Sequence, residues 1–196
     1  GVSRYDGRSF VTYTTRDVIA NAQMITIMQD RRGHVWFGTG GGGITRFDGQ
    51  IFQSLAVEDG LPSNNIHFLH EDPDGTIWFS SAAGLTRFRP PSPFPPGIAI
   101  DAVVAGRRYE DPTQVSVPSG LGITTFEFHG MSFKTRTGAM VCRYRLNGYD
   151  TDWRTTNDRR VEYADLPAGS YTFEVQAVDR DLAYSEEPAT VRLTVH

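Results

Sequence analysis

The sequence predicts an all-β protein: a partial β-propeller of about two blades, followed by an immunoglobulin- or fibronectin-like β-sandwich. Two observations support this prediction. Residues 33–39 (GHVWFGT) return 42 positions later as residues 75–81 (GTIWFSS), and a fixed period near 40 residues is typical of propeller blades. Beyond a proline-rich segment this period stops, and residues 171–177 alternate apolar and polar side chains as half-buried strands do.

The propeller part is predicted to cover residues 1–89. One period has four apolar runs separated by turn residues, and four antiparallel strands make one blade. Asp48-Gly49 favours a hairpin between two of these runs, because glycine accepts the positive φ of the turn. We expect the four strands at 25–29, 35–39, 43–47 and 52–55, the tail of an earlier blade at 2–13, and three strands of a later blade within 66–89.

Trp36 and Trp78 occupy the same position in the two copies of the repeat. A blade cannot bury both of its faces alone, so each tryptophan is expected to pack against a neighbouring blade. Apolar neighbours such as Val35 and Phe37 favour this structural role. The alternative is a tryptophan that stacks on sugar rings.

The chain contains too few blades to close a ring, which needs roughly four to eight. Uncovered blades leave sheet faces and edges exposed. We therefore expect either a homo-oligomer whose copies complete a ring or further blades elsewhere in a longer polypeptide. Residues 11–13, in this chain or in a partner chain, are a candidate for the outer strand that the last blade lacks.

Residues 90–96 form a predicted linker that contains five prolines. Such a run disfavours helix and sheet and prefers a stiff extended form, so we interpret it as a semi-rigid spacer. A proline-rich ligand for a signalling partner is the alternative. The sandwich is predicted to cover residues 97–196, with strands at 98–105, 114–117, 123–129, 140–146, 160–163, 170–178 and 190–195.

Within the sandwich, three features suggest specific packing. The segment 166–171 (LPAGSY) is typical of a tyrosine corner, in which the Tyr171 hydroxyl is tied to the preceding turn. Trp153 is expected to cover one end of the core. Cys142 lies in a predicted strand with no histidine near it, so we expect a small core residue rather than a nucleophile.

Composition and motifs argue against several kinds of chemistry. The net charge of −4 gives no indication of a nucleic-acid partner, and a single cysteine excludes an internal disulfide. No apolar stretch approaches the ~20 residues that span a bilayer. The five histidines lack metal-site spacing, and Gly40–Gly43 precedes no Gly-Lys-Ser/Thr, so we expect no cofactor, no metal and no catalytic residues.

Three tyrosines carry a resemblance to a known family. Residues 144–153 (YRLNGYDTDW) and 161–173 (VEYADLPAGSYTF) resemble the triple-tyrosine (Y_Y_Y) domain of bacterial sensors, whose naming tyrosines correspond to Tyr144, Tyr163 and Tyr171. Residues 30–47 and the segment 60–66 (GLPSNNI) resemble the two-component-regulator propeller repeats. The second repeat departs from the family pattern, because Ser80-Ser81 stands where Gly-Thr is usual.

The resemblance implies a function. In this family the two modules form the extracytoplasmic sensor of a membrane-bound signalling protein, followed by a membrane helix and usually a histidine kinase. It implies a periplasmic location, a membrane helix beyond His196, a propeller that senses a ligand such as a glycan fragment, and a dimeric, non-catalytic sandwich that relays the signal.

Propeller topology indicates where a ligand would bind. The loop before each innermost strand and the loop between the second and third strands share one face. This rule groups Asn64, Asn65 and His67 with Gly40–Gly43 and Ser81–Ala83. The asparagines are candidates to hydrogen-bond hydroxyl-rich ligands, but they also fit a purely structural turn. A propeller enzyme acting on carbohydrate and a self-assembling scaffold are the alternative functions.

Overall fold

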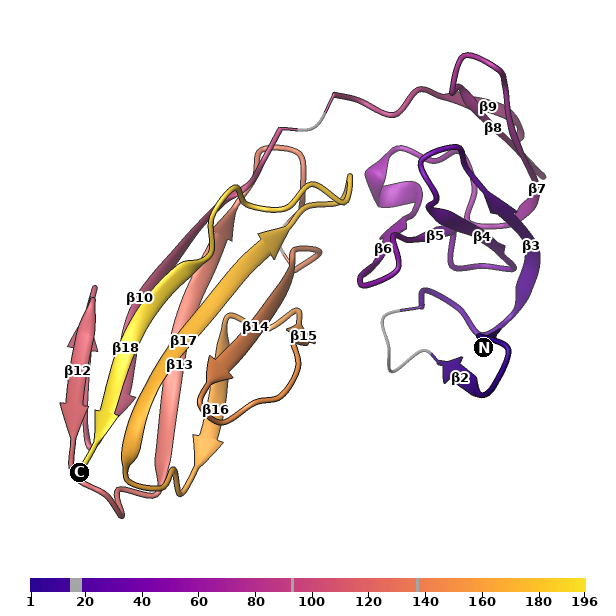
Figure 1. The fold of residues 1–196 in the computed structure, drawn as a ribbon. Coiled ribbons are helices and arrows are strands. Elements are labelled where there is room, and N and C mark those ends of the chain that lie inside the picture. The colour runs from indigo at the N-terminus through magenta and orange to yellow at the C-terminus, as the bar shows by residue number, and fades with distance from the viewer. Residues whose placement is uncertain (15–18, 93, 137) are drawn as a thin grey trace. The chain divides into compact units, whose positions relative to one another are not determined.

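The computed structural model describes residues 1–14, 19–92, 94–136 and 138–196 of the 196-residue chain (Figure 1). These residues form five β-sheets and one short 3-10 helix, η2 (Val57–Asp59). They divide into two compact units: Gly1–Ser92 with Arg180–Leu182, and Pro93–Asp179 with Ala183–His196. We call them the propeller unit and the sandwich unit. The predicted linker includes residue 93, which lies outside the described residues.

The propeller unit contains one four-stranded blade, one three-stranded blade and a hairpin, as the 42-residue repeat predicts. The strands of the complete blade pair antiparallel in chain order, and so do those of the incomplete blade. The complete blade consists of β3 (Met24–Gln29), β4 (Val35–Thr39), β5 (Ile44–Phe47) and β6 (Phe52–Leu55). The incomplete blade consists of β7 (Ile66–Glu71), β8 (Ile77–Ser81) and β9 (Gly84–Phe88), and the hairpin of β1 (Val2–Tyr5) and β2 (Phe10–Tyr13).

The hairpin corrects one expectation. All four residues of β2 pair with β1, in the register Val2↔Tyr13 to Tyr5↔Phe10. Residues 11–13 therefore do not supply the fourth strand of the β7–β9 blade within this chain. The hairpin instead packs by Tyr13 against the complete blade, with ring centroids 5.5 Å from Phe47 and 5.0 Å from Phe52.

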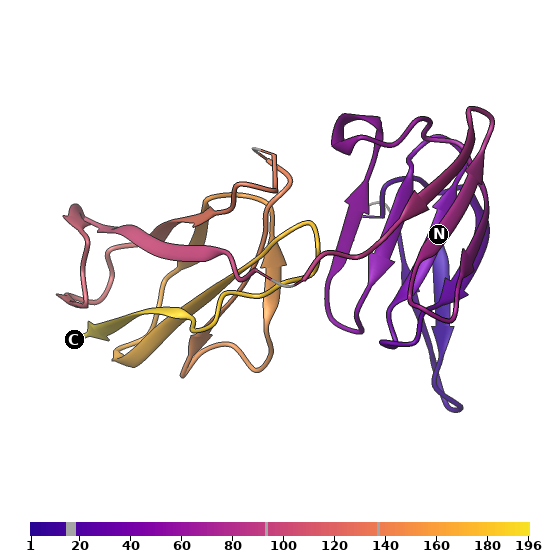
Figure 2. The same ribbon diagram turned by 90° about the horizontal axis from the view of Figure 1, so that it is seen from above.

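Trp36 packs between the two blades, as predicted. Its side chain is 1% exposed and shares an apolar cluster with residues of both sheets, including Ile44 of β5 and Ile77 of β8. It meets Phe88 edge to face at 5.9 Å, a favourable geometry for two rings. Figure 2 shows the sheets of the propeller unit stacked face to face.

Each tryptophan is fixed by an aspartate six residues earlier. The Trp36 indole N–H donates to Asp30 Oδ2 at 2.8 Å, and the Trp78 indole N–H donates to Asp72 Oδ2 at 2.7 Å. Asp30 also accepts the backbone N–H groups of Arg32 and His34. The Asp-x-x-Gly turn and the tryptophan are thus one hydrogen-bonded unit, which explains their fixed spacing.

Gly38 explains why the repeat has a glycine after Trp-Phe. A Cβ on Gly38 would lie 2.7 Å from Ile66 Cγ2 of the next blade and 2.6 Å from Thr26 Cγ2, so a side chain would push the two sheets apart. The equivalent residue in the second repeat is Ser80, which is half-buried. The departure from Gly-Thr at Ser80-Ser81 therefore lies in the blade whose corresponding face no other described blade covers.

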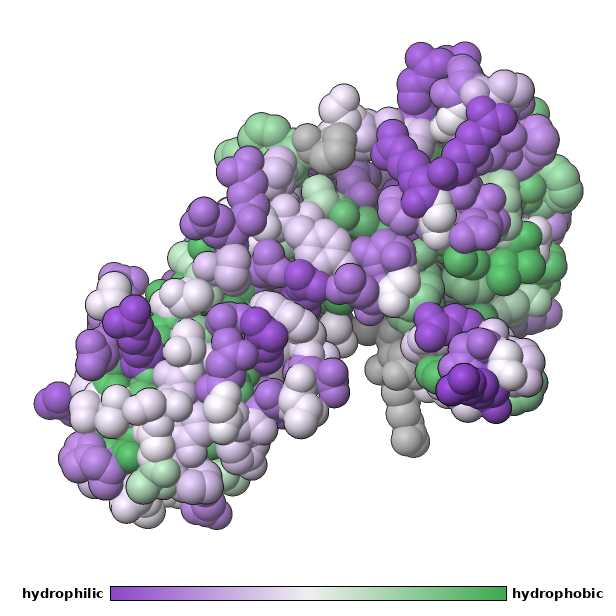
Figure 3. All heavy atoms as spheres, in the orientation of Figure 1, coloured by the Kyte–Doolittle hydropathy of each residue, from purple (hydrophilic) through white to green (hydrophobic). Residues whose placement is uncertain are grey.

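The last blade presents an uncovered apolar face. Ile44 of the complete blade is 0% exposed, whereas the equivalent Leu85 is 68% exposed. Phe68 is 59% exposed, and Trp78 is only half-buried. On the complete blade, Ile27 of β3 is also exposed, and Figure 3 shows apolar surface on the side of the propeller unit where β3 lies.

The sandwich unit has two facing sheets. One has the order β11-β10-β13-β16 and the other β12-β18-β17-β14-β15, with β12 and β18 parallel. The expected seven strands are all present, and the structure adds β11 and β15, which the sequence did not reveal. The strands are β10 (Gly97–Ala105), β11 (Arg107–Glu110), β12 (Gln114–Val117), β13 (Ile123–Met131), β14 (Val141–Asn147), β15 (Arg154–Thr156), β16 (Arg160–Ala164), β17 (Gly169–Val178) and β18 (Ala189–Val195).

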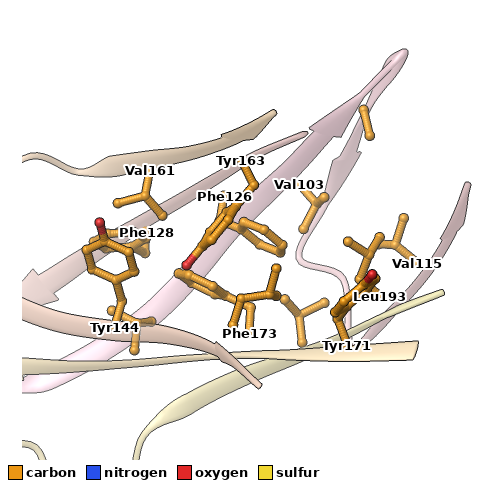
Figure 4. Close-up of a cluster of buried hydrophobic side chains, with 14 of the residues drawn as sticks. Val103, Val115, Phe126, Phe128, Tyr144, Val161, Tyr163, Tyr171, Phe173 and Leu193 are labelled. Carbon is orange, nitrogen blue, oxygen red and sulfur yellow. The ribbon is translucent and has the colours of Figure 1, made fainter. Parts of the chain in front are cut away.

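The sandwich core lies between these sheets (Figure 4). Phe126 of β13 stacks on Phe173 of β17 with ring centroids 4.1 Å apart. The predicted alternation is confirmed, because Phe173, Val175 and Ala177 are fully buried in this cluster. Cys142 also belongs to the core, and burial raises the pKa of its thiol to about 11, so the thiol stays protonated at neutral pH.

The three naming tyrosines all belong to this core. The Tyr171 hydroxyl donates to the Pro167 carbonyl at 2.8 Å, which confirms the tyrosine corner. The Tyr163 hydroxyl donates to Asp150 Oδ2 at 2.5 Å, and the same carboxylate accepts the Leu146 N–H. The third ring, Tyr144, packs 6.2 Å from Phe173.

Trp153 does not cover the core, contrary to the expectation. The guanidinium groups of Arg143 and Arg145 each lie 4.6 Å from its ring centre, and Arg143 also stacks on Tyr184. These arginines alternate along β14 with the buried Cys142, Tyr144 and Leu146, so they point away from the core. Trp153 is therefore half-buried on the outer face of the five-stranded sheet.

We predict that Asp30→Ala destabilises the propeller unit more than Asp72→Ala. Asp30→Ala leaves the buried Trp36 N–H and two backbone N–H groups without their acceptor, which costs about 2–4 kcal/mol. Water can replace the carboxylate at the half-exposed Trp78. Urea unfolding followed by tryptophan fluorescence measures both changes, and equal shifts in the midpoint would contradict the predicted order.

We predict that Tyr163 makes the sandwich unit sensitive to alkali. Burial and the hydrogen bond to Asp150 raise the pKa of Tyr163 well above its usual range. The pKa of Tyr163 is higher in the folded state than in the unfolded state. Its contribution to the free energy of unfolding is therefore constant below the unfolded pKa of about 10 and falls above it, by at most about 1.4 kcal/mol per pH unit.

Tyr163→Phe should therefore flatten the loss of stability above about pH 10. It should also lower stability at pH 8 by about 1 kcal/mol, because Asp150 loses a donor. Urea midpoints at a series of alkaline pH values measure both effects. The same alkaline slope in Tyr163→Phe and the parent protein would show that another group controls it.

Candidate functional site

The predicted ligand face lies where the loops of the two blades meet. Asn65 forms an isolated β-bridge with Gly40, and Ser81 pairs with Ile66 at the start of β7. The structure thus brings together the three segments that topology grouped: residues 40–43, 64–67 and 81–83.

Asn64 has a structural role. Its side-chain oxygen accepts the Val57 N–H at 2.9 Å, and its backbone carbonyl accepts the N–H groups of Gly41 at 3.1 Å and Gly43 at 2.8 Å. These bonds tie the loop before β7 to the glycine run of the neighbouring blade. They favour the turn interpretation of Asn64 over the ligand interpretation.

The glycine run cannot form an anion nest in this conformation, because all four of its backbone N–H groups have protein acceptors. Gly40 donates to the Gln23 carbonyl, Gly42 donates to Thr39 Oγ1, and Gly41 and Gly43 share the Asn64 carbonyl. Gly43 must be glycine: its φ is +80°, and an added Cβ would lie 2.1 Å from the Leu55 carbonyl oxygen.

Asn65 and His67 are exposed and are the better candidates for ligand contact. His67 lies at a register shift between Ile66 and Phe68 in β7, and the equivalent Ile25 lies at the same shift in β3. Such a bulge reorients a side chain at the end of a strand, and bulges are frequent beside binding sites. Repetition in both blades indicates that the bulge is a feature of the repeat itself.

The exposed side chains of this face offer hydrogen-bonding groups. Within the described ranges, no three His, Cys, Asp or Glu side chains gather closely enough to hold a metal ion. The side chains of Asn65 and His67, an amide and an imidazole, can both donate and accept hydrogen bonds. The sequence analysis did not identify the structural role of Asp30 and Asp72. The signal was present in the repeat, because each aspartate precedes its tryptophan by six residues.

The fold defines a propeller-and-sandwich protein, and sequence similarity to known families identifies its modules. Residues 19–41 and 60–83 match the family described as two component regulator propeller, and residues 137–196 match the Y_Y_Y domain. These segments cover β3–β4, β7–β8 and β14–β18. The chain therefore carries two-component-regulator propeller repeats followed by a Y_Y_Y domain.

The chain is similar to two known proteins, to one in sequence and to the other in fold. Over 53 residues, 27% of this chain, the sequence is 36% identical to histidine kinase P4 of Formosa agariphila, and the match spans 4% of that protein. The fold is similar to the extracellular domain of a B. thetaiotaomicron protein described as a hybrid two-component system, with a TM-score of 0.55 and 20% identity. That alignment covers 96% of this chain and 28% of the solved chain.

Among the described residues, no helix is long and apolar enough to cross a bilayer.

We predict that Asn64→Ala and Asn65→Ala separate structure from surface at this face. Asn64→Ala removes the acceptor of the Val57 N–H and should lower the free energy of unfolding by about 1 kcal/mol. Asn65→Ala changes an exposed side chain and should stay within about 0.5 kcal/mol of the parent. Thermal unfolding of both variants measures the difference, and equal destabilisation would contradict the assigned roles.

Proposed function

We propose that this chain is the ligand-sensing and signal-relaying part of an extracytoplasmic receptor of the two-component type, and that it is not catalytic. The observation that carries the proposal is the occurrence of two modules in one chain: propeller repeats match the first two strands of both blades, and a Y_Y_Y domain matches β14–β18 of the sandwich. A location outside the cytoplasm and a membrane helix beyond His196 belong to the same proposal.

The sandwich is suited to relay. Its first strand begins beside the end of β13, with Gly97 opposite Met131, and its last strand ends beside the start of β17, with Val195 opposite Gly169. The end of β13 and the start of β17 lie at opposite ends of the sandwich. The chain therefore enters the sandwich at one end and leaves it at the other. A displacement at the linker would then cross the whole rigid core.

The propeller unit needs additional blades to form a ring. The uncovered face of the last blade, with Phe68, Trp78 and Leu85, matches the face that the complete blade covers with its neighbour. We propose that further blades or a second copy of the chain cover it, and that a complete ring presents the Asn65 and His67 face to a glycan fragment or another small molecule.

A carbohydrate-acting propeller enzyme and a self-assembling scaffold are the competing functions. The decisive experiment uses the complete gene product in membranes, with oligosaccharides added while autophosphorylation or output activity is measured. We expect a response to one oligosaccharide class, and we expect Asn65→Ala and His67→Ala to shift its half-maximal concentration upwards by about fivefold or more, since each hydrogen bond contributes about 1 kcal/mol.

The control variant in this experiment is Gln50→Ala, which changes an exposed residue of the β5–β6 turn and should leave the response unchanged. Chromatographic detection of cleaved oligosaccharide would instead establish an enzyme. Concentration-dependent self-association in solution, together with no response to any oligosaccharide, would favour the scaffold.

A further inference from the structure

A pocket of about 560 Å³ opens at the end of the sandwich unit where β10 begins. Its floor includes Phe128 of β13, Cys142 of β14 and Met140, which directly precedes β14, and its rim includes Phe94, Met131 and Phe133. This volume is within the range of small-molecule sites. None of the three naming tyrosines lines it, so it is separate from the hydrogen-bonded tyrosines of the core.

Exposed apolar side chains concentrate around this pocket. Six large hydrophobic residues are exposed in the described part of the sandwich unit, and three of them line the pocket. Phe133 is completely exposed, Phe94 is 68% exposed and Met131 is 53% exposed. Exposed apolar side chains that cluster beside a concave surface are typical of a binding site.

The charges around the pocket favour an anion. Arg136 and Arg159 line it against a single acidic residue, Asp158. Lys134, the only lysine of the chain, is adjacent, with its ammonium group 5.9 Å from the Phe94 ring centre. Arg159 is exposed, so its guanidinium can reach a ligand.

We propose that this pocket binds a small amphipathic anion, with its carboxylate or similar head group at Arg159 and its apolar chain over Phe128, Met131 and Met140. Such a ligand would also contact Phe94 and so fasten the segment before β10 to the end of the sandwich. This site is independent of the proposed sensing face of the propeller unit.

Methionine-methyl NMR tests this proposal on the intact 196-residue chain. The chain has four methionines: Met131 and Met140 line the pocket, whereas Met24 and Met28 lie in β3 of the propeller unit and serve as internal controls. Titration with sodium octanoate should give saturable shifts of the Met131 and Met140 methyl signals. The Met24 and Met28 signals should not follow the same curve.

Variants distinguish the head group from the chain. Arg159→Gln should weaken octanoate binding by about fivefold, the upper end for an exposed ion pair, without changing binding of neutral octan-1-ol. Phe133→Ala should weaken both ligands by about the same factor, because it removes apolar surface from the rim of the pocket. The matched controls are Arg160→Gln, which lies outside this pocket, and Ile123→Ala at the opposite end of β13.

Three results would overturn the proposal. The first is the absence of saturable Met131 and Met140 shifts with octanoate. The second is an equal effect of Arg159→Gln and Arg160→Gln. The third is a shift of both signals on raising the protein concentration alone, which would assign the pocket to a second copy of the chain. The substituted residues are exposed, so we expect each variant to fold. An unchanged midpoint of thermal unfolding verifies this for each variant.

Discussion

The propeller unit depends on one repeated interaction, the hydrogen bond from a tryptophan indole to the aspartate six residues before it. The aspartate closes the turn between the first two strands of a blade and also fixes the ring that the next blade covers. One carboxylate therefore connects local chain reversal with packing between sheets. The neighbouring Gly38 allows the close approach that buries Trp36, since a Cβ there would meet Ile66 at 2.7 Å. The loss of the carboxylate or of the glycine would therefore weaken the stacking of the two blades.

The sandwich unit uses tyrosine hydroxyls for a similar purpose. Tyr171 fixes the turn before β17, and Tyr163 fixes the loop after β14 through Asp150. Each ring contributes apolar area to the core while its hydroxyl satisfies a loop at the sheet margin. The outer face is held differently, by arginine side chains stacked on Trp153. The core and the outer face thus combine apolar burial with a few directed polar contacts.

Much of this fold could be predicted because its signals are local. The period of the repeat located β3–β9, and strict alternation located β17 and β18. Two strands escaped notice for physical reasons: residues 107–110 (RRYE) show no apolar alternation, and β15 has only three residues. Trp153 was misplaced because its size suggested the core, whereas its partners are arginines on another strand. At the ligand face, topology grouped the loops correctly, but the bonds from Gly41 and Gly43 to Asn64 join residues more than 20 positions apart. The pocket beside Phe133 brings together Phe94, Phe128 and Arg159 from separate segments of the chain, which no local pattern encodes.

The mixed pairing of the last strand has a mechanical consequence. β18 is hydrogen-bonded on both sides, antiparallel to β17 and parallel to β12. Because the chain enters and leaves the sandwich at opposite ends, tension between them runs along the strands. That tension loads the two ladders of β18 in shear, so many bonds must fail together rather than unzip one by one. A domain with this geometry transmits a pull with little internal yielding.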